Sequence, residues 1–331
     1  MFNANKKQPR LGQWDGRRQS SRSDPLVPPE VWSKAVLVRL IPVVITVVIV
    51  SVLAFAWGAP LPYRVGEVTA GDLRARVAFE VVDQPATARA REDAVKALPP
   101  HLRDDPGACE TARADVSPVL QKYPREMPLV LRGQPITDQQ LALLDQEHHA
   151  FQRSLTVYDH LRGFASLFLI TTLFAAVSVI YVVRFQAALA QSLSKITSVC
   201  ILVAVTLATA LLLSGSPWYA AIVPLTVTAL ILTLAYNPQF ALLMSLTIVM
   251  ETALALAADL NDVLVELAGV STAILLLRNV RTRMRIIEVG ACAGLAFLAM
   301  TVATMLIEGQ TWRLIAFDSA RHFVWGALAG F

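Results

Sequence analysis

The sequence has few charged residues and few cysteines for its length. Only 16% of its 331 residues are Asp, Glu, Lys or Arg, whereas about a quarter of the residues in a soluble domain are charged, and this argues against a soluble globular protein. The three cysteines, Cys109, Cys200 and Cys292, form no CxxC or Cys/His spacing, so the sequence predicts no zinc site and no obvious disulfide within a domain. It also has no Gly-rich phosphate loop, HExxH motif or nucleophile elbow. A membrane-embedded enzyme is therefore disfavoured, because no catalytic cluster is visible.

Hydrophobic residues are abundant instead, at 55% of the chain. They fall in blocks of roughly twenty, the length at which a helix crosses the hydrocarbon core of a bilayer. The net charge of +4 is concentrated at the ends of these blocks, so it bears on membrane topology rather than on nucleic-acid binding. The sequence predicts a predominantly α polytopic membrane helix bundle that contacts the lipid bilayer and binds no nucleic acid.

The first part of the chain predicts a tail and an anchor. Residues 1–37 are polar and basic, which is typical of a disordered cytoplasmic tail. Residues 38–57 form the first apolar block, an N-terminal transmembrane anchor. The "AFAW" sequence at 54–57 would also suit signal-peptidase cleavage, but the basic leader is much longer than that of a usual signal peptide, which favours an uncleaved anchor.

Residues 58–160 hold most of the remaining charge and predict a small extracytoplasmic α/β sensor domain, with a ligand that the sequence does not identify. The expected elements are a strand over 74–83, a helix over 85–98, a second helix over 106–123 that is broken or kinked near Pro118, and a short strand over 129–136.

A long helix is expected to follow this domain. The sequence "TDQQ" at 137–140 is a capping-box pattern, and the helical pattern continues without a break into the next apolar block, which predicts one continuous helix over 137–183. Its apolar seam either packs on its own small domain or forms a homodimer through the stalk at 137–160. The seam consists of Leu141, Leu144, His148, Phe151, Leu155 and Tyr158.

Residues 161–331 predict a seven-span membrane domain, which with the anchor makes one N-terminal span plus about seven more. The block at 262–277 is the weakest, because it is short and holds Glu266, and it either spans fully or is re-entrant. The last block is expected to be incomplete, because its uninterrupted apolar run from Phe323 to Phe331 covers only ~13 Å of a ~30 Å core. We therefore expect a truncated chain, through a fragment, a frameshift or a gene-model error; the alternative is a natural terminus with the last helix at the interface or dipping in from outside. The blocks lie at about 163–183, 196–213, 217–236, 238–257, 262–277, 286–307 and 314–331.

Charged residues in this half suggest the topology and two candidate polar sites. Arg278, Arg281, Arg283 and Arg285 lie between two apolar blocks, and such arginines remain on the cytoplasmic side, which also places the N-terminus in the cytoplasm. Glu251 and Glu266 are the candidate intramembrane polar residues. A charge there costs at least ~2.5 kcal/mol, so each is expected to have a polar partner or a function. Asp318, Arg321 and His322 are expected at the outer interface.

The order of these parts resembles one known family. "YRVGEVTAGDLRARVAFEVVDQPATARAREDAVKALPP" (63–100) and "LRGQPITDQQLALL" (131–144) resemble the extracellular region of the seven-transmembrane receptors with an intracellular HD hydrolase. "YNPQFALLMSL" (236–246) and "RNVRTRMR" (278–285) resemble the membrane domain of that family. The resemblance covers about residues 38–331, and the external domain is shorter than is usual in the family.

The resemblance implies a bacterial inner (cytoplasmic) membrane receptor that passes an extracytoplasmic signal to a cytoplasmic HD domain. In this family that domain follows the last span and uses metal-bound histidines and aspartates to hydrolyse a cyclic dinucleotide, typically cyclic di-AMP. No His-Asp dipeptide occurs in this sequence, so no catalytic, cofactor-binding or metal-binding residue is predicted in the chain, and divalent metals are expected only in the missing HD domain. The alternative interpretation is a multi-pass transporter or channel.

Overall fold

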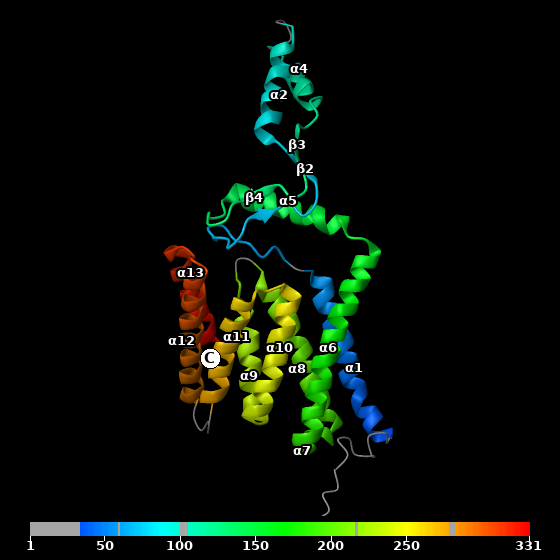
Figure 1. The fold of residues 1–331 in the computed structure, drawn as a ribbon, viewed down its shortest axis with the longest axis vertical. Helices are drawn as coiled ribbons and strands as arrows, with labels where there is room; N and C mark the ends of the chain where they lie inside the picture. Colours follow the sequence, from blue (N-terminus) through cyan, green and yellow to red (C-terminus); the bar gives the residue numbers. More distant parts are fainter. Residues whose placement is uncertain (1–33, 59, 100–102, 104, 216–217, 278–282) are drawn as a thin grey trace, which may run out of the picture.

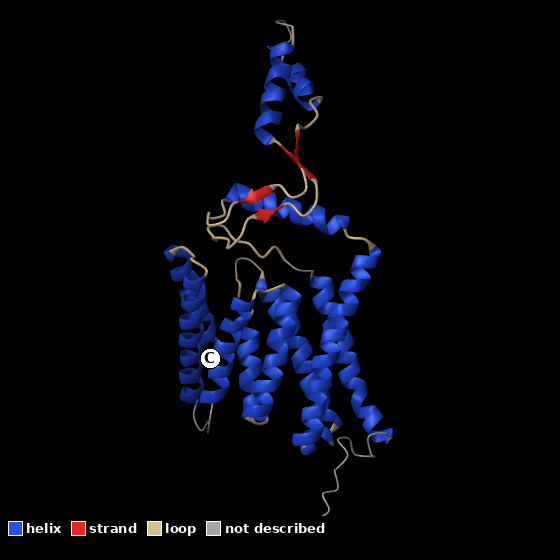
Figure 2. Cartoon of the chain, in the orientation of Figure 1, coloured by secondary structure: helices blue, strands red, loops and turns tan. Residues whose placement is uncertain are grey.

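The computed structural model describes residues 34–58, 60–99, 103, 105–215, 218–277 and 283–331. The predicted tail at 1–37 therefore lies almost entirely outside the described residues. The described part consists of a helix bundle and a head region, which we define as residues 60–154, at one end of the bundle (Figure 1). Figure 2 shows that strands occur only in the head.

The bundle begins with α1 and α6, which connect it to the head. Its helices are α1 (Lys34–Trp57), α6 (Val157–Phe185), the short α7 (Ala187–Ala190), α8 (Leu193–Ser214), α9 (Ile222–Ala235), α10 (Pro238–Leu256), α11 (Leu260–Leu276), α12 (Arg283–Ile307) and α13 (Trp312–Leu328).

Five of the described helices are long and apolar enough to cross a membrane, namely α1, α6, α8, α10 and α12. The helices α9, α11 and α13 are shorter, at 14, 17 and 17 residues, although they lie beside the others in Figure 1. The predicted membrane crossings of α9, α11 and α13 therefore stay predictions. The helix α6 presents Leu169, Leu173 and Ile180 at its surface, as expected for side chains that contact lipid.

The helices α12 and α13 form a close antiparallel hairpin because glycines face each other along it. A methyl group added at Gly294 would lie 2.7 Å from the carbonyl oxygen of Phe323, and one added at Gly290 would lie 2.7 Å from the Cα of Gly330. Small residues at this spacing let helix backbones approach each other within a membrane. The contact also shows that α13 begins well before Phe323 and that its C-terminal end reaches the level of Gly290.

The head contains two small antiparallel pairs of strands and three described helices. The strand β1 (Leu73–Arg74) pairs with β4 (Pro128–Val130), and β2 (Phe79–Val82) pairs with β3 (Leu120–Tyr123). The helices α2 (Gln84–Ala97) and α4 (Pro106–Ala114) project furthest from the bundle, whereas α5 (Asp138–Ser154) lies across the bundle end (Figure 1). The buried core of the head consists of Ala75, Phe79, Leu129, Val130, Ile136 and Leu144.

Two predicted elements of the head are divided in the structure. The expected strand over 74–83 is interrupted because the backbone N–H of Arg76 donates to the Glu147 carboxylate at 2.8 Å instead of to another strand. The expected helix over 106–123 ends at Ala114. Beyond it, the backbone N–H of Val119 donates to the Thr87 hydroxyl at 3.0 Å, and the chain enters β3.

The prediction of one continuous helix over 137–183 is wrong. Leu155 and Thr156 adopt extended backbone conformations, and α5 ends before them while α6 begins after them. Thr156 caps α6, because its hydroxyl accepts from the N–H of Asp159 at 3.3 Å and the Asp159 carboxylate accepts from the N–H of Thr156 at 3.0 Å. The two helices consequently run in different directions (Figure 1).

The apolar seam of α5 packs on the head itself. Leu144 is buried in the head core, and Leu141 packs against it. A homodimer through residues 137–160 stays a prediction, but the side chain of Leu144 is already buried in the core of its own head.

Candidate functional site: contacts between the head and the last helix

Residues 64–68, which we call the coupling segment, are a part of the head that contacts the bundle. On the head side, the N–H of Gly66 donates to the carbonyl of Ile136 at 2.8 Å, and the N–H of Ile136 donates to the carbonyl of Glu67 at 2.9 Å. Gly66 has a φ of +84°, a conformation that glycine adopts without steric cost. Ile136 directly precedes Thr137, the N-cap of α5, so the coupling segment is tied to the start of that helix.

On the bundle side, the same segment binds the turn between α12 and α13. The N–H of Val68 donates to Oε1 of Gln310 at 2.9 Å, and Nε2 of Gln310 donates to the carbonyl of Val68 at 3.1 Å. One side-chain amide thereby satisfies both backbone groups of Val68. Nε2 of Gln310 also lies 3.3 Å from Oε2 of Glu308, and Glu308 accepts from the side-chain amide of Asn261 at the start of α11.

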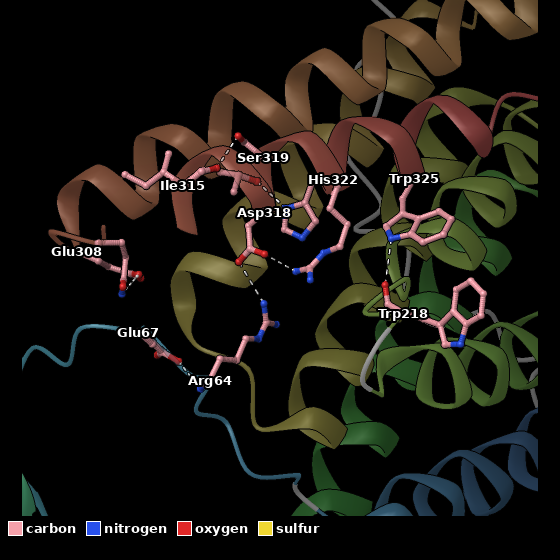
Figure 3. A network of polar contacts seen from close by, with 12 residues as sticks. Arg64, Glu67, Trp218, Glu308, Ile315, Asp318, Ser319, His322 and Trp325 are labelled. Carbon is pink, nitrogen blue, oxygen red and sulfur yellow. Dashed lines mark hydrogen bonds and ion pairs between the residues drawn. The ribbon is translucent and has the colours of Figure 1, made fainter. Parts of the chain in front are cut away.

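An ion-pair cluster joins the coupling segment to α13 (Figure 3). Nη1 of Arg64 lies 3.2 Å from Oδ2 of Asp318, and Nη2 of Arg321 lies 2.8 Å from Oδ1 of the same carboxylate. Asp318 is only 2% exposed. A buried carboxylate is strongly destabilising when its partners are removed, so the two guanidinium groups make this position of the chain sensitive to mutation.

The loop before α9 contributes an aromatic ring to the same cluster. The guanidinium carbons of Arg64 and Arg321 lie 4.1 Å and 4.8 Å from the centre of the Tyr219 ring, which is cation–π distance. Next to the cluster, Nε1 of Trp325 donates to the carbonyl of Trp218 at 3.1 Å. The coupling segment, the α8–α9 loop and α13 therefore meet at one place.

His322 extends the polar contacts from α13 to α12. Its Nδ1 lies 2.7 Å from the hydroxyl oxygen of Thr301, and that hydroxyl also lies 2.8 Å from the carbonyl oxygen of Phe297. Asp318, Arg321 and His322 thus form a largely buried network that holds helices together, and their predicted place at the outer interface stays a prediction.

Glu67 is the acidic member of the coupling segment. Its Oε2 accepts from the N–H of Arg64 at 2.9 Å. Burial raises the pKa of Glu67 to about 7, and the negative charges of Glu308 and Asp262 contribute to the increase. Glu67 therefore changes charge near neutral pH, next to the residues that connect the head to α13.

The predicted intramembrane residues Glu251 and Glu266 lie on different helices. Glu251 is buried on α10, where it accepts from the hydroxyl of Thr171 at 2.9 Å. Glu266 lies on α11, and its Oε2 is buried with no hydrogen-bond partner among the described residues.

The four topology-setting arginines are only partly described. Arg278 and Arg281 lie outside the described residues. Arg283 begins α12, and Arg285 is exposed and forms an ion pair with Glu288 at 2.8 Å. These described positions lie at the end of the bundle away from the head (Figure 1).

Sequence reasoning missed Arg64 and Gln310, and also the glycine contacts between α12 and α13. Arg64 lies in a segment that resembles the family, and its partner lies 254 positions away, which no local pattern reveals. The glycines did leave a signal, because "GACAG" (290–294) and "GALAG" (326–330) both have the GxxxG spacing of closely packed membrane helices.

No three His, Cys, Asp or Glu side chains among the described residues are placed so that they could hold a metal ion. The contacts that the structure shows at this site are hydrogen bonds and ion pairs within the chain, which connect the head to α13 and to the turn before it.

Comparison with known proteins places the chain in a family through its membrane half. No curated protein and no solved structure matches it. The model of the family described as "7TM receptor with intracellular HD hydrolase" matches residues 161–331. Since this match covers more than half of the chain, the protein belongs to the family of seven-transmembrane receptors with an intracellular HD hydrolase.

Proposed function

We propose that this chain is the sensing and transmitting part of a receptor whose output is an intracellular HD hydrolase that cleaves a cyclic dinucleotide such as cyclic di-AMP. The head senses an extracytoplasmic signal, and the coupling segment passes the change to α13. The observation that carries the proposal is the pair of attachments of residues 64–68: hydrogen bonds to Ile136 on the head side and the ion pair of Arg64 with Asp318 on the bundle side.

The proposed orientation has the N-terminus in the cytoplasm of a bacterium and the head outside the inner membrane. The charges of Arg39, Arg184, Lys195 and Arg285 lie near helix ends opposite the head. Basic residues near the ends of membrane helices favour the cytoplasmic side, so these four residues support the orientation.

The test joins an HD phosphodiesterase domain of the same family to Phe331 and measures cyclic di-AMP hydrolysis in reconstituted membranes. We expect Arg64→Ala to change the rate, because it removes the contact of the coupling segment with Asp318. Arg91→Ala, on the projecting helix α2, is the matched control and should leave the rate unchanged. Equal rates for the original fusion and both variants would contradict the proposal.

A transporter or channel is the alternative function, and the buried carboxylate of Glu251 is the observation that favours it, since such residues mark transport pathways in many membrane proteins. Solute uptake into proteoliposomes that contain the purified chain separates the two functions. We expect no uptake above that of empty liposomes.

A further inference from the structure

Glu251 lies in an apolar part of the bundle with an incomplete set of partners. It is 3% exposed. Its Oε2 accepts one hydrogen bond, from the Thr171 hydroxyl on α6 at 2.9 Å. Its Oε1 is buried and has no hydrogen-bond partner among the described residues.

A second buried polar atom with no partner belongs to Ser51 on α1. Ser51 is fully buried, and its Oγ makes no hydrogen bond within the described part of the chain. An unpaired hydroxyl in an apolar interior is destabilising. Both groups therefore require a hydrogen-bond partner that the described residues do not supply in this arrangement.

The packing of the helices places Ser51 and Glu251 in the same layer of the bundle, without a hydrogen bond between them in the structure. One apolar cluster contains Ala54 of α1, Leu167 of α6 and Ala255 of α10. Residues three or four positions apart lie on the same face of a helix. On the same faces, one helical turn further from the head, lie Ser51 of α1, Thr171 of α6 and Glu251 of α10. Three polar side chains from three helices therefore occupy the next layer of the bundle.

Charge compensation for an ionised Glu251 is missing from the surrounding helices. The faces of α1, α6 and α8 in this region contribute Val50, Leu167 and Leu207, none of which titrates. The buried polar residues of α9 are threonines. On α11 the acidic groups are Glu266 and Asp262, which interact with each other, and no Lys, Arg or His among the described residues forms an ion pair with Glu251.

We propose that Glu251, Ser51 and Thr171 form an intramembrane proton site that docks α1 and α6 on α10. The carboxylate of Glu251 takes up one proton on Oε1, and a side-chain rotation brings the resulting O–H to Oγ of Ser51, which has no hydrogen-bond partner among the described residues, while Oε2 continues to accept from Thr171. This arrangement pairs both orphaned atoms and leaves no net charge in the bilayer. Because α1 and α6 are the two helices that connect to the head, loss of the proton would weaken the attachment of this pair to the bundle.

The proton site does not depend on the proposed receptor function, and infrared spectroscopy of the purified chain tests it directly. At pH 7 we expect a protonated-carboxyl C=O band that Glu251→Gln removes. Ser51→Ala and Thr171→Val should retain the band and shift it to higher frequency, because each removes one hydrogen bond. Glu288→Gln, at an exposed position of α12, is the control and should remove a carboxylate band only. If Glu251→Gln also removes only a carboxylate band, the proposal is wrong.

A second measurement uses the unaltered protein and so does not depend on how the variants fold. Dicyclohexylcarbodiimide reacts with protonated carboxyl groups in apolar surroundings, and mass spectrometry of peptides locates the adduct. We expect an adduct on Glu251 at pH 7 that is independent of sodium ions. No adduct on Glu251 at pH 7 would contradict the proposal, and an adduct that sodium ions suppress at constant pH would show that the site binds sodium in competition with the proton.

Discussion

Arg64 and Asp318 form an ion pair across 254 positions of the sequence, with Nη1 of the arginine 3.2 Å from Oδ2 of the aspartate. Arg64 belongs to the segment that enters the head, and Asp318 to the last described helix. The carboxylate is buried and lies between two guanidinium groups. Removal of one partner of a buried ion pair is strongly destabilising. This interaction therefore links the position of the head to that of α13.

Proton binding by Glu67 should make the stability of the head attachment depend on pH. The pKa of Glu67 in the folded protein is about 7, raised from an ordinary 4.5 chiefly by burial. The folded state therefore binds a proton more tightly than the unfolded state, and its stabilising contribution is full below about pH 4.5 and is lost as the pH rises through about 7. We expect thermal unfolding temperatures to fall between pH 5 and pH 8 in the wild type and to fall less in Glu67→Gln.

The control for this prediction is Glu110→Gln, which changes an exposed residue of α4. It should keep the pH dependence of the wild type. If Glu67→Gln and the wild type lose stability in parallel over this pH range, titration of Glu67 is not the cause.

Larger residues at the glycine contacts should separate α12 from α13. A Cβ at Gly294 would lie 2.7 Å from the carbonyl oxygen of Phe323, a backbone atom that a rotamer change cannot move. We expect Gly294→Val to lower the free energy of unfolding by about 1–3 kcal/mol, the usual cost of overpacking. Equilibrium unfolding in detergent measures it. Gly163→Ala on α6, where the nearest atom is 4.0 Å away, should not destabilise the protein, and equal effects of the two changes would contradict the packing account.

The proposed orientation predicts which cysteines react from outside an intact cell. In a variant without the three native cysteines, Arg153→Cys at the end of α5 should react with a membrane-impermeant maleimide. Arg285→Cys, at the start of α12, should react only after the membrane is permeabilised. Both positions are exposed in the chain, so the difference reports the side of the membrane. Labelling of the cysteine at 285 in intact cells would show that the topology is the reverse of the proposed one.

The sequence predicted the apolar helices well, because each long block follows from composition alone, and it predicted a family that the comparison confirmed for residues 161–331. The break between α5 and α6 was missed. Its signal was nevertheless present, since Thr156 and Asp159 have the spacing of a capping box, as do Thr137 and Gln140. The apolar residues of 137–183 continue at helical spacing across this second cap, so the pattern alone predicts one helix.

The contacts of the candidate site could not be predicted in the same way. Asp318 and Arg321 were visible as charges in an apolar block, but their partner Arg64 depends on how the coupling segment crosses the end of the bundle. The same holds for Gln310, whose pairing with Val68 depends on tertiary structure. Local patterns specify helices and caps, whereas these hydrogen bonds join segments more than two hundred residues apart.

Amide hydrogen exchange of the coupling segment tests the central claim most directly. The N–H groups of Gly66 and Ile136 are hydrogen-bonded within the head, whereas Asp318 forms its ion pairs with Arg64 and Arg321. If α13 holds the head through Arg64, Asp318→Asn should accelerate exchange at both amides, whereas the control Glu288→Gln should leave it unchanged. Unchanged protection of Gly66 and Ile136 in Asp318→Asn would show that the last helix does not control the coupling segment.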